Sequence, residues 1–113
     1  MNEEIEVKIE TVPNATIMRP IGDIDLSRAP ALRSSLRNVQ QQHPSCLVID
    51  LGEVPYMDSS GVATLVEAMQ IARRESTRLV LCGLQERVRS IFEIARLDMV
   101  FVIADDRQAA LSA

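Results

Sequence analysis

The chain has 113 residues, the size of one domain, so we expect a single domain over residues 1–113. Hydrophobic residues make up 47% and charged residues 25%, close to the average for soluble globular proteins, which argues against disorder and against a fibrous repeat. The formal net charge is -4 and aromatic residues are only 3%, so nucleic acid is not an expected partner. Nucleic-acid binding needs a basic face or rings on which bases stack.

The apolar runs are strand-sized and fall well short of the ~20 residues that span a bilayer. The N-terminal segment over residues 1–4 carries two glutamates and no basic residue, unlike a secretory signal. We therefore expect a cytoplasmic protein with no direct membrane insertion. Cys46 and Cys82 lie in separate apolar runs without metal or redox spacing, which predicts two buried reduced thiols.

The first elements in chain order form a predicted hairpin. Residues 5–9 alternate between apolar and charged side chains, as in a half-buried strand. Pro13 and Asn14 indicate a turn, and residues 15–21 predict a second strand. Pro20 has no N–H to donate, so we expect it at a strand end, an edge or a bulge.

After a polar loop over residues 22–27 that ends in candidate helix caps, helices and strands alternate. The expected elements are a helix over 29–42, a strand over 46–51, a helix from the 58–61 segment to 74, a strand over 79–83, a helix over 84–95, a strand over 101–104 and a terminal helix or frayed tail over 105–113. The order β-β-α-β-α-β-α-β-α predicts an α/β fold. Its mixed, mostly parallel sheet has four to five strands, with helices packed on it.

No arrangement of residues typical of an enzyme is present. The single histidine, His43, lies in a Gln-rich helix end, where we expect a solvated surface residue. The chain has no phosphate-binding glycine loop, no dinucleotide fingerprint and no nucleophile elbow. Asp105 and Asp106 precede a predicted helix and are expected to cap it. We therefore expect no catalytic residue, cofactor or metal, and a binding module rather than an enzyme.

The informative segment lies between the buried strand and the second long helix and contains Asp58, Ser59, Ser60 and Gly61. Taken alone, an Asp or Ser at this point is most simply a helix cap. The functional alternative is a hydroxyl held where helix N–H groups and the helix dipole would stabilise a phosphate. In that case the modified chain would stay folded while its surface changed charge, as a phosphorylation switch requires.

At these residues the chain resembles the STAS domain family, and most of all its free-standing bacterial anti-sigma factor antagonists. The resemblance covers nearly the whole chain: residues 22–25 before the first helix, 48–51 in the central strand, 57–61 as the family signature, and 81–83 and 88–97 further along. Asp-Ser-Ser-Gly alone is a weak match. At the start of the second long helix, in this order of elements, it is a strong one.

The resemblance implies that Ser59 accepts a phosphate, with Ser60 as the second choice. It places Asp23, Asp25, Asp58, Ser59, Ser60 and Gly61 on the partner-binding face. The implied partners are a serine kinase that acts as an anti-sigma factor and a cognate serine phosphatase. The unmodified antagonist would bind the kinase and release the sigma factor, and phosphorylation at Ser59 would end that binding.

Other functions remain open from the sequence. The main alternative is a non-catalytic accessory subunit of a membrane transport complex of the ABC type, whose members often carry other residues in place of Ser59 and Ser60. A stressosome-type scaffold and an enzyme acting on a small molecule are weaker alternatives. Val62 and Ala63 replace the Gly-Leu-Gly often found in the family, so the partner is not fixed by the resemblance.

Overall fold

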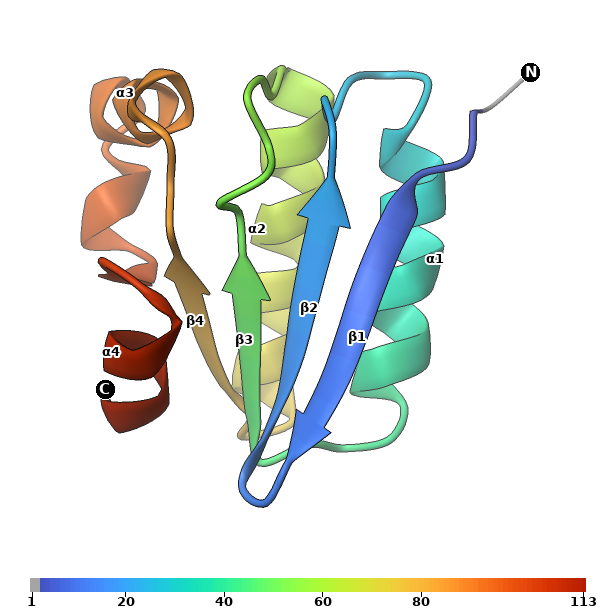
Figure 1. The fold of residues 1–113 in the computed structure, drawn as a ribbon, viewed down its shortest axis with the longest axis vertical. Helices are drawn as coiled ribbons and strands as arrows, with labels where there is room; N and C mark the ends of the chain where they lie inside the picture. The colour runs from blue at the N-terminus through green and yellow to red at the C-terminus, as the bar shows by residue number, and fades with distance from the viewer. Residues whose placement is uncertain (1–2) are drawn as a thin grey trace.

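A computed structural model describes residues 3–113 (Figure 1). The elements in chain order are β1 (Glu6–Val12), β2 (Ala15–Ile21), α1 (Ala29–Gln40), β3 (Cys46–Asp50), α2 (Ser59–Arg74), β4 (Arg78–Cys82), α3 (Glu86–Ile94), a 3-10 helix η1 (Leu97–Met99), β5 (Val102–Ala104) and α4 (Arg107–Ser112). The α/β fold and the order of strands and helices predicted from the sequence are confirmed, with η1 added.

The five strands form one mixed sheet in the order β1-β2-β3-β4-β5. β1 and β2 form the predicted antiparallel hairpin, and the pairs from β2 to β5 are parallel. Pro20 pairs with Val7 of β1, but β3 pairs only with residues 16–18 of β2. Pro20 therefore lies beyond the doubly paired part of β2, as expected for a residue that cannot donate a hydrogen bond.

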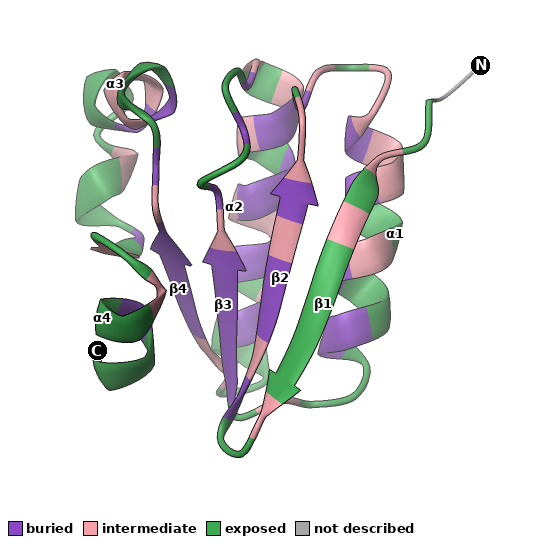
Figure 2. Ribbon diagram, viewed as in Figure 1, coloured by how far each residue is buried: buried purple, intermediate pink, exposed green. Residues whose placement is uncertain are grey.

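The helices cover the two faces of the sheet unequally. α1 and α2 lie together on one face, and the short α4 covers part of the other, on the β4 side (Figure 1). The strands β3 and β4 are almost fully buried, whereas the edge strand β1 is mostly exposed (Figure 2). This burial explains why residues 46–49 and 79–82 are apolar on both sides, while β1 alternates. None of the helices within residues 3–113 is long and apolar enough to cross a membrane.

After β4, the structure differs from the expected elements or defines them more closely in three places. α3 begins at Glu86 rather than at residue 84, and Leu84 is buried before the helix starts. The chain between α3 and β5 contains η1, which periodicity alone did not predict. The terminal segment is a helix, α4, and the Asp106 carboxylate caps it by accepting a hydrogen bond from Ala109 N at 2.8 Å.

Candidate functional site

The Asp58–Gly61 corner joins the chain after β3 to the start of α2. Asp58 is the N-cap residue, and its extended backbone (φ -100°, ψ -173°) turns the side chain back over the first turn. Asp58 Oδ1 accepts hydrogen bonds from Ser60 N at 2.9 Å and Gly61 N at 3.4 Å. These bonds satisfy two of the N–H groups that a helix start leaves without intrahelical partners. The capping role considered from the sequence therefore belongs to Asp58.

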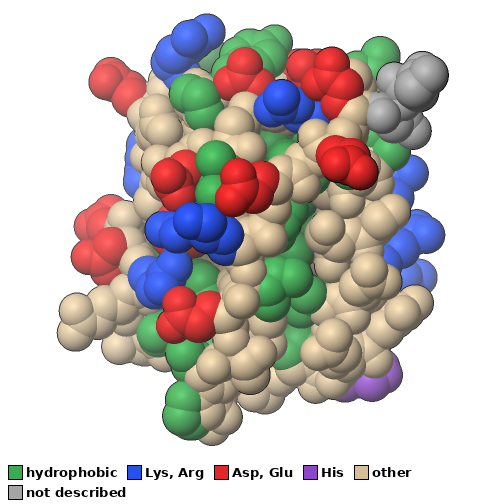
Figure 3. All heavy atoms as spheres, turned by 45° about the vertical axis from the view of Figure 1, so that its right-hand side comes forward, with side chains coloured by type: hydrophobic (Ala, Val, Ile, Leu, Met, Phe, Trp, Pro, Cys, Tyr) green, Lys and Arg blue, Asp and Glu red, His purple; other side chains and the backbone are tan. Residues whose placement is uncertain are grey.

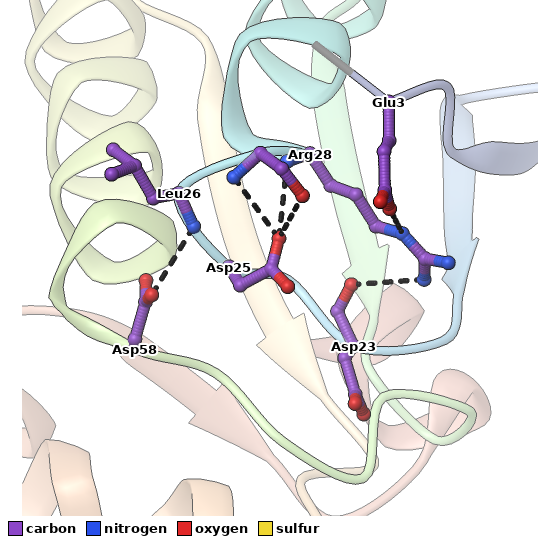
Figure 4. A network of polar contacts seen from close by, with 7 residues as sticks. Glu3, Asp23, Asp25, Leu26, Arg28 and Asp58 are labelled. Carbon is purple, nitrogen blue, oxygen red and sulfur yellow. Dashed lines mark hydrogen bonds and ion pairs between the residues drawn. The ribbon is translucent and has the colours of Figure 1, made fainter. Parts of the chain in front are cut away.

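The loop over residues 22–28 is attached to this corner through backbone bonds. Ile24 N donates to Tyr56 O at 3.0 Å, and Asp58 N donates to Ile24 O at 3.1 Å. The second carboxylate oxygen of Asp58 accepts from Leu26 N at 3.2 Å (Figure 4). The Asp58 side chain thus binds both the start of α2 and Leu26, which lies 32 residues away in sequence. It fixes the position of the loop relative to the helix.

Gly61 is required at the corner for close packing. A Cβ atom at this position would lie 2.5 Å from Met57 Cγ, 2.8 Å from Ile24 Cγ2 and 3.2 Å from Ile24 O. Real Cβ contacts are not this short, so any larger residue would push the two segments apart. The glycine of the motif therefore sets how closely the 22–28 loop approaches α2.

Asp25 organises the other side of the same loop. Its Oδ1 accepts hydrogen bonds from Ser27 Oγ at 2.7 Å, Ser27 N at 3.1 Å and Arg28 N at 3.2 Å (Figure 4). The hydrogen bond from the Ser27 hydroxyl, followed by those from the two backbone N–H groups, lowers the pKa of Asp25 below its usual value despite some desolvation. Arg28, the N-cap residue of α1, has no side-chain cap bond, so the turn depends on Asp25.

Arg28 connects this loop to the N-terminal segment. Its Nε lies 3.2 Å from Glu3 Oε2, and its Nη1 donates to Asp23 O at 3.3 Å (Figure 4). The side chain of Asp23 is exposed, and only its backbone carbonyl takes part in these contacts. The six residues predicted for the partner-binding face, Asp23, Asp25, Asp58, Ser59, Ser60 and Gly61, therefore lie in two loops that the structure joins.

Ser59 is the first residue of α2 and is exposed, whereas Ser60 is half-buried. The sequence left open whether the helix N–H groups at this corner are capped or are free to stabilise a phosphate. In the structure, the N–H groups of Ser60 and Gly61 are bound to Asp58. A phosphate on Ser59 would therefore lie beside the Asp58 carboxylate and face solvent, so its main effect would be to add negative charge to the corner.

Two apolar side chains at this surface were not selected from the sequence. Leu26 is 73% exposed, and Tyr56 is exposed with the Arg87 guanidinium 5.7 Å from its ring centroid. The only sequence signal was a leucine within a polar loop. Acidic side chains gather toward the upper end of the molecule, where the parallel strands end (Figure 3). The corner thus combines exposed apolar groups, carboxylates and a hydroxyl on one surface.

The other reactive groups lie away from this corner. His43 is exposed, and its Nδ1 lies 3.4 Å from Glu75 Oε1. Cys46 and Cys82 are buried and free, as predicted. Burial, and secondarily the Asp50 carboxylate, raise the pKa of Cys82 to about 11, so this thiol is protonated near neutral pH. Residues 3–113 contain no group of three or more His, Cys, Asp or Glu side chains placed to hold a metal ion.

Comparison with known proteins identifies the family. Residues 6–110 match the STAS domain model. The chain is 37% identical over 103 residues to an anti-sigma-B factor antagonist of Listeria monocytogenes, covering 91% of this chain and 90% of the relative. It is 31% identical over 100 residues to an anti-sigma-B factor antagonist of Bacillus subtilis, covering 88% and 91%.

A solved structure gives the same result at the level of the fold. The crystal structure of an anti-sigma factor antagonist from Mycobacterium paratuberculosis superposes with a TM-score of 0.89 at 26% identity, covering 96% of this chain and 92% of that one. The alignments extend over nearly the full length of both chains, so they include the corner and the loop that contacts it. The chain therefore belongs to the STAS domain family and resembles its free-standing bacterial anti-sigma factor antagonists.

Proposed function

We propose that this protein is a cytoplasmic anti-sigma factor antagonist and acts as a binding module rather than as an enzyme. Its unmodified Asp58–Gly61 corner would dock on a serine kinase that serves as the anti-sigma factor. The kinase would then phosphorylate Ser59 and release the antagonist, and a cognate phosphatase would reverse the modification. The antagonists that match over about nine-tenths of their length support the first part of this proposal.

The observation that best supports the switch is the position of Ser59. Its side chain is exposed at the start of a helix whose cap, Asp58, is a different residue. A kinase would therefore reach the hydroxyl without unfolding the corner. Modification would not remove a hydrogen bond on which the start of α2 depends.

The charge already present explains why phosphorylation would end binding. A phosphate adds about -1.5 to -2 charge at neutral pH. It would lie beside Asp58, on a surface that also carries Asp23 and Asp25. Burying an unpaired charge of this kind in an interface costs several kcal/mol, against about -8 kcal/mol for a micromolar complex. The modified protein would therefore dissociate while its fold stayed intact.

The experiment is phosphorylation of the purified protein by a serine-kinase anti-sigma factor from the same organism, followed by mass spectrometry. We expect one added phosphate on the native protein, none on Ser59→Ala, and full addition on the matched control Ser60→Ala. Full phosphorylation of Ser59→Ala with loss in Ser60→Ala would move the site to Ser60. Specific copurification with a transporter ATPase instead of a kinase would overturn the antagonist function.

A second measurement separates release from loss of folding. Ser59→Asp should weaken kinase binding at least tenfold by calorimetry, because it places a second carboxylate beside Asp58. The thermal midpoint should change little, because an acidic residue in the first turn of a helix is favourable by up to about 1 kcal/mol and offsets that repulsion. A variant that unfolds at room temperature would show that Ser59 has a structural role and that the switch is wrong.

A further inference from the structure

A second surface lies at the other end of α2. An apolar groove with a cavity volume of about 190 Å³ runs between α2, the start of β4 and the chain that enters β5. Its walls include Met69 and Ala72 of α2, Leu79 of β4, and Val100 and Phe101 before β5. We call it the β5 groove. The 16 residues of α2 rise ~1.5 Å each, so the groove is roughly 20 Å from Ser59.

The chain that leads into β5 carries exposed apolar side chains. Met99 of η1 is 80% exposed, and Val102 of β5 is 52% exposed. Ile94 in the last turn of α3 is also largely exposed, and so is part of Val100. Single exposed apolar residues need no explanation, but Val100 and Val102 both line the apolar groove, which indicates a surface that another molecule covers.

The sheet edge at the groove is open for backbone pairing. β5 pairs with β4 through Val102, Ile103 and Ala104. No strand within residues 3–113 pairs with its other side. An edge strand of this kind offers N–H and C=O groups to an added strand, a common mode of peptide recognition. β1, at the opposite edge, is longer and carries alternating charges that discourage such pairing.

One arginine determines the charge of the ligand. Arg73 lines the β5 groove, is exposed, and donates from Nη2 to Val100 O at 3.3 Å. Its guanidinium has no carboxylate within 4.0 Å in the described chain. Arg78 also borders the groove, but its guanidinium donates to Leu111 O of α4, on the other face of the sheet. An arginine without a carboxylate partner favours an acidic ligand.

We propose that the β5 groove binds an extended, acidic segment of a partner protein by strand addition to β5. Aliphatic side chains of that segment would enter the groove, and a carboxylate would pair with Arg73. Because Ser59 is at the far end of α2, this binding would not depend on its phosphorylation.

The probe is a fluorescein-labelled seven-residue peptide of alternating aspartate and valine, titrated into the ¹⁵N-labelled full chain. We expect amide shifts at Leu79 and over residues 100–104, and a Kd below about 1 mM by fluorescence anisotropy. Arg73→Glu should weaken binding at least tenfold. The matched control is Arg74→Glu, an adjacent arginine of α2 that does not line the groove and should bind normally. Ser59→Asp should also bind normally.

Three results would overturn the proposal. One is the absence of shifts at the groove in millimolar peptide while circular dichroism shows a folded chain. Another is equal binding of a peptide with lysine in place of aspartate, which would show that Arg73 does not select an acidic ligand. The third is concentration-dependent self-association with shifts in β1 and β5 in the absence of peptide. That result would assign the groove to a second copy of this chain rather than to a partner.

Discussion

The two ends of α2 present opposite kinds of surface. At its N-terminal end, a carboxylate caps the helix and also holds the 22–28 loop, and Oδ1 of the neighbouring Asp25 accepts hydrogen bonds from backbone and hydroxyl donors. At its C-terminal end, Arg73 donates only to a backbone carbonyl, and exposed apolar residues surround an open groove. Hydrogen bonds fix the first surface. The second has an arginine without a carboxylate partner and apolar side chains that are exposed to solvent.

This difference shows why charge alone does not identify a functional surface. Acidic residues at a helix N-terminus and basic residues at its C-terminus both interact favourably with the helix dipole. Asp58 and Arg73 are therefore each explained as stabilising residues. What separates them is the rest of the site: an exposed hydroxyl beside Asp58, and an apolar groove with an open strand edge beside Arg73. The predictions below test whether the N-terminal end is as tightly constrained as its contacts indicate.

The largest effect is expected from Gly61→Ala. The added methyl group would overlap Met57 Cγ and Ile24 Cγ2, so we expect the free energy of unfolding to fall by about 1–3 kcal/mol in urea titration. The better helix propensity of alanine, about 1 kcal/mol, would offset part of this loss. In a Met57→Ala background the same substitution should cost less, because the nearest atom is gone. Unchanged stability in the native background would show that the 22–28 loop moves to accommodate the methyl group at little cost in free energy.

A loss of similar size is expected from Asp58→Ala. Removing an N-cap typically costs about 1 kcal/mol, and here the bond from Leu26 N is lost as well, for about 0.5–1.5 kcal/mol more. The matched control is Asp106→Ala, which removes a cap from α4 but no bond between separate segments. Thermal unfolding of both variants measures the difference. Equal losses would mean that the Leu26 contact contributes nothing.

The smallest effect is a local one at acid pH. Hydrogen bonds favour the charged form of Asp25 and lower its pKa, so the stability they contribute is present above the unfolded value near ~4. It is lost as the pH falls through the lowered pKa of the folded protein. Amide-exchange protection of Ser27 and Arg28 should fall in this range, with little change at Leu79 beside the β5 groove. In Asp25→Asn, the protection of Ser27 should be low and independent of pH, and an unaltered profile would contradict this account.

Much of the fold follows from local patterns in the sequence. Alternation in β1, continuous apolar runs in β3 and β4, and helical spacing in α1 and α2 each predict the observed element. The start of α3 was missed because Leu84 is apolar in the same period as the helix that follows it. η1 was missed because three residues are too few to show a helical period. A buried residue before a helix and one inside it look alike in a sequence, since only packing distinguishes them.

The candidate site was predicted in its residues but not in its internal arrangement. The sequence placed Asp58 and Ser59 between a strand and a helix, and the structure confirms that position. It did not show that Asp58 would bind the N–H groups of Ser60 and Gly61, which are therefore not free to stabilise a phosphate. It also did not show that Leu26 would be exposed next to Asp58. Both features depend on the contact between the 22–28 loop and the Asp58–Gly61 corner.

The sequence by itself therefore determined the order of the elements, the identity of the corner and the family, because these depend on periodicity and on short motifs read along the chain. Only the tertiary structure decided which hydrogen bonds the corner has already used and that Met69, Leu79 and Phe101 line one groove. The physical reason is that hydrogen bonds and apolar contacts act between atoms that are close in space. Sequence spacing constrains that closeness only within a single strand or helix.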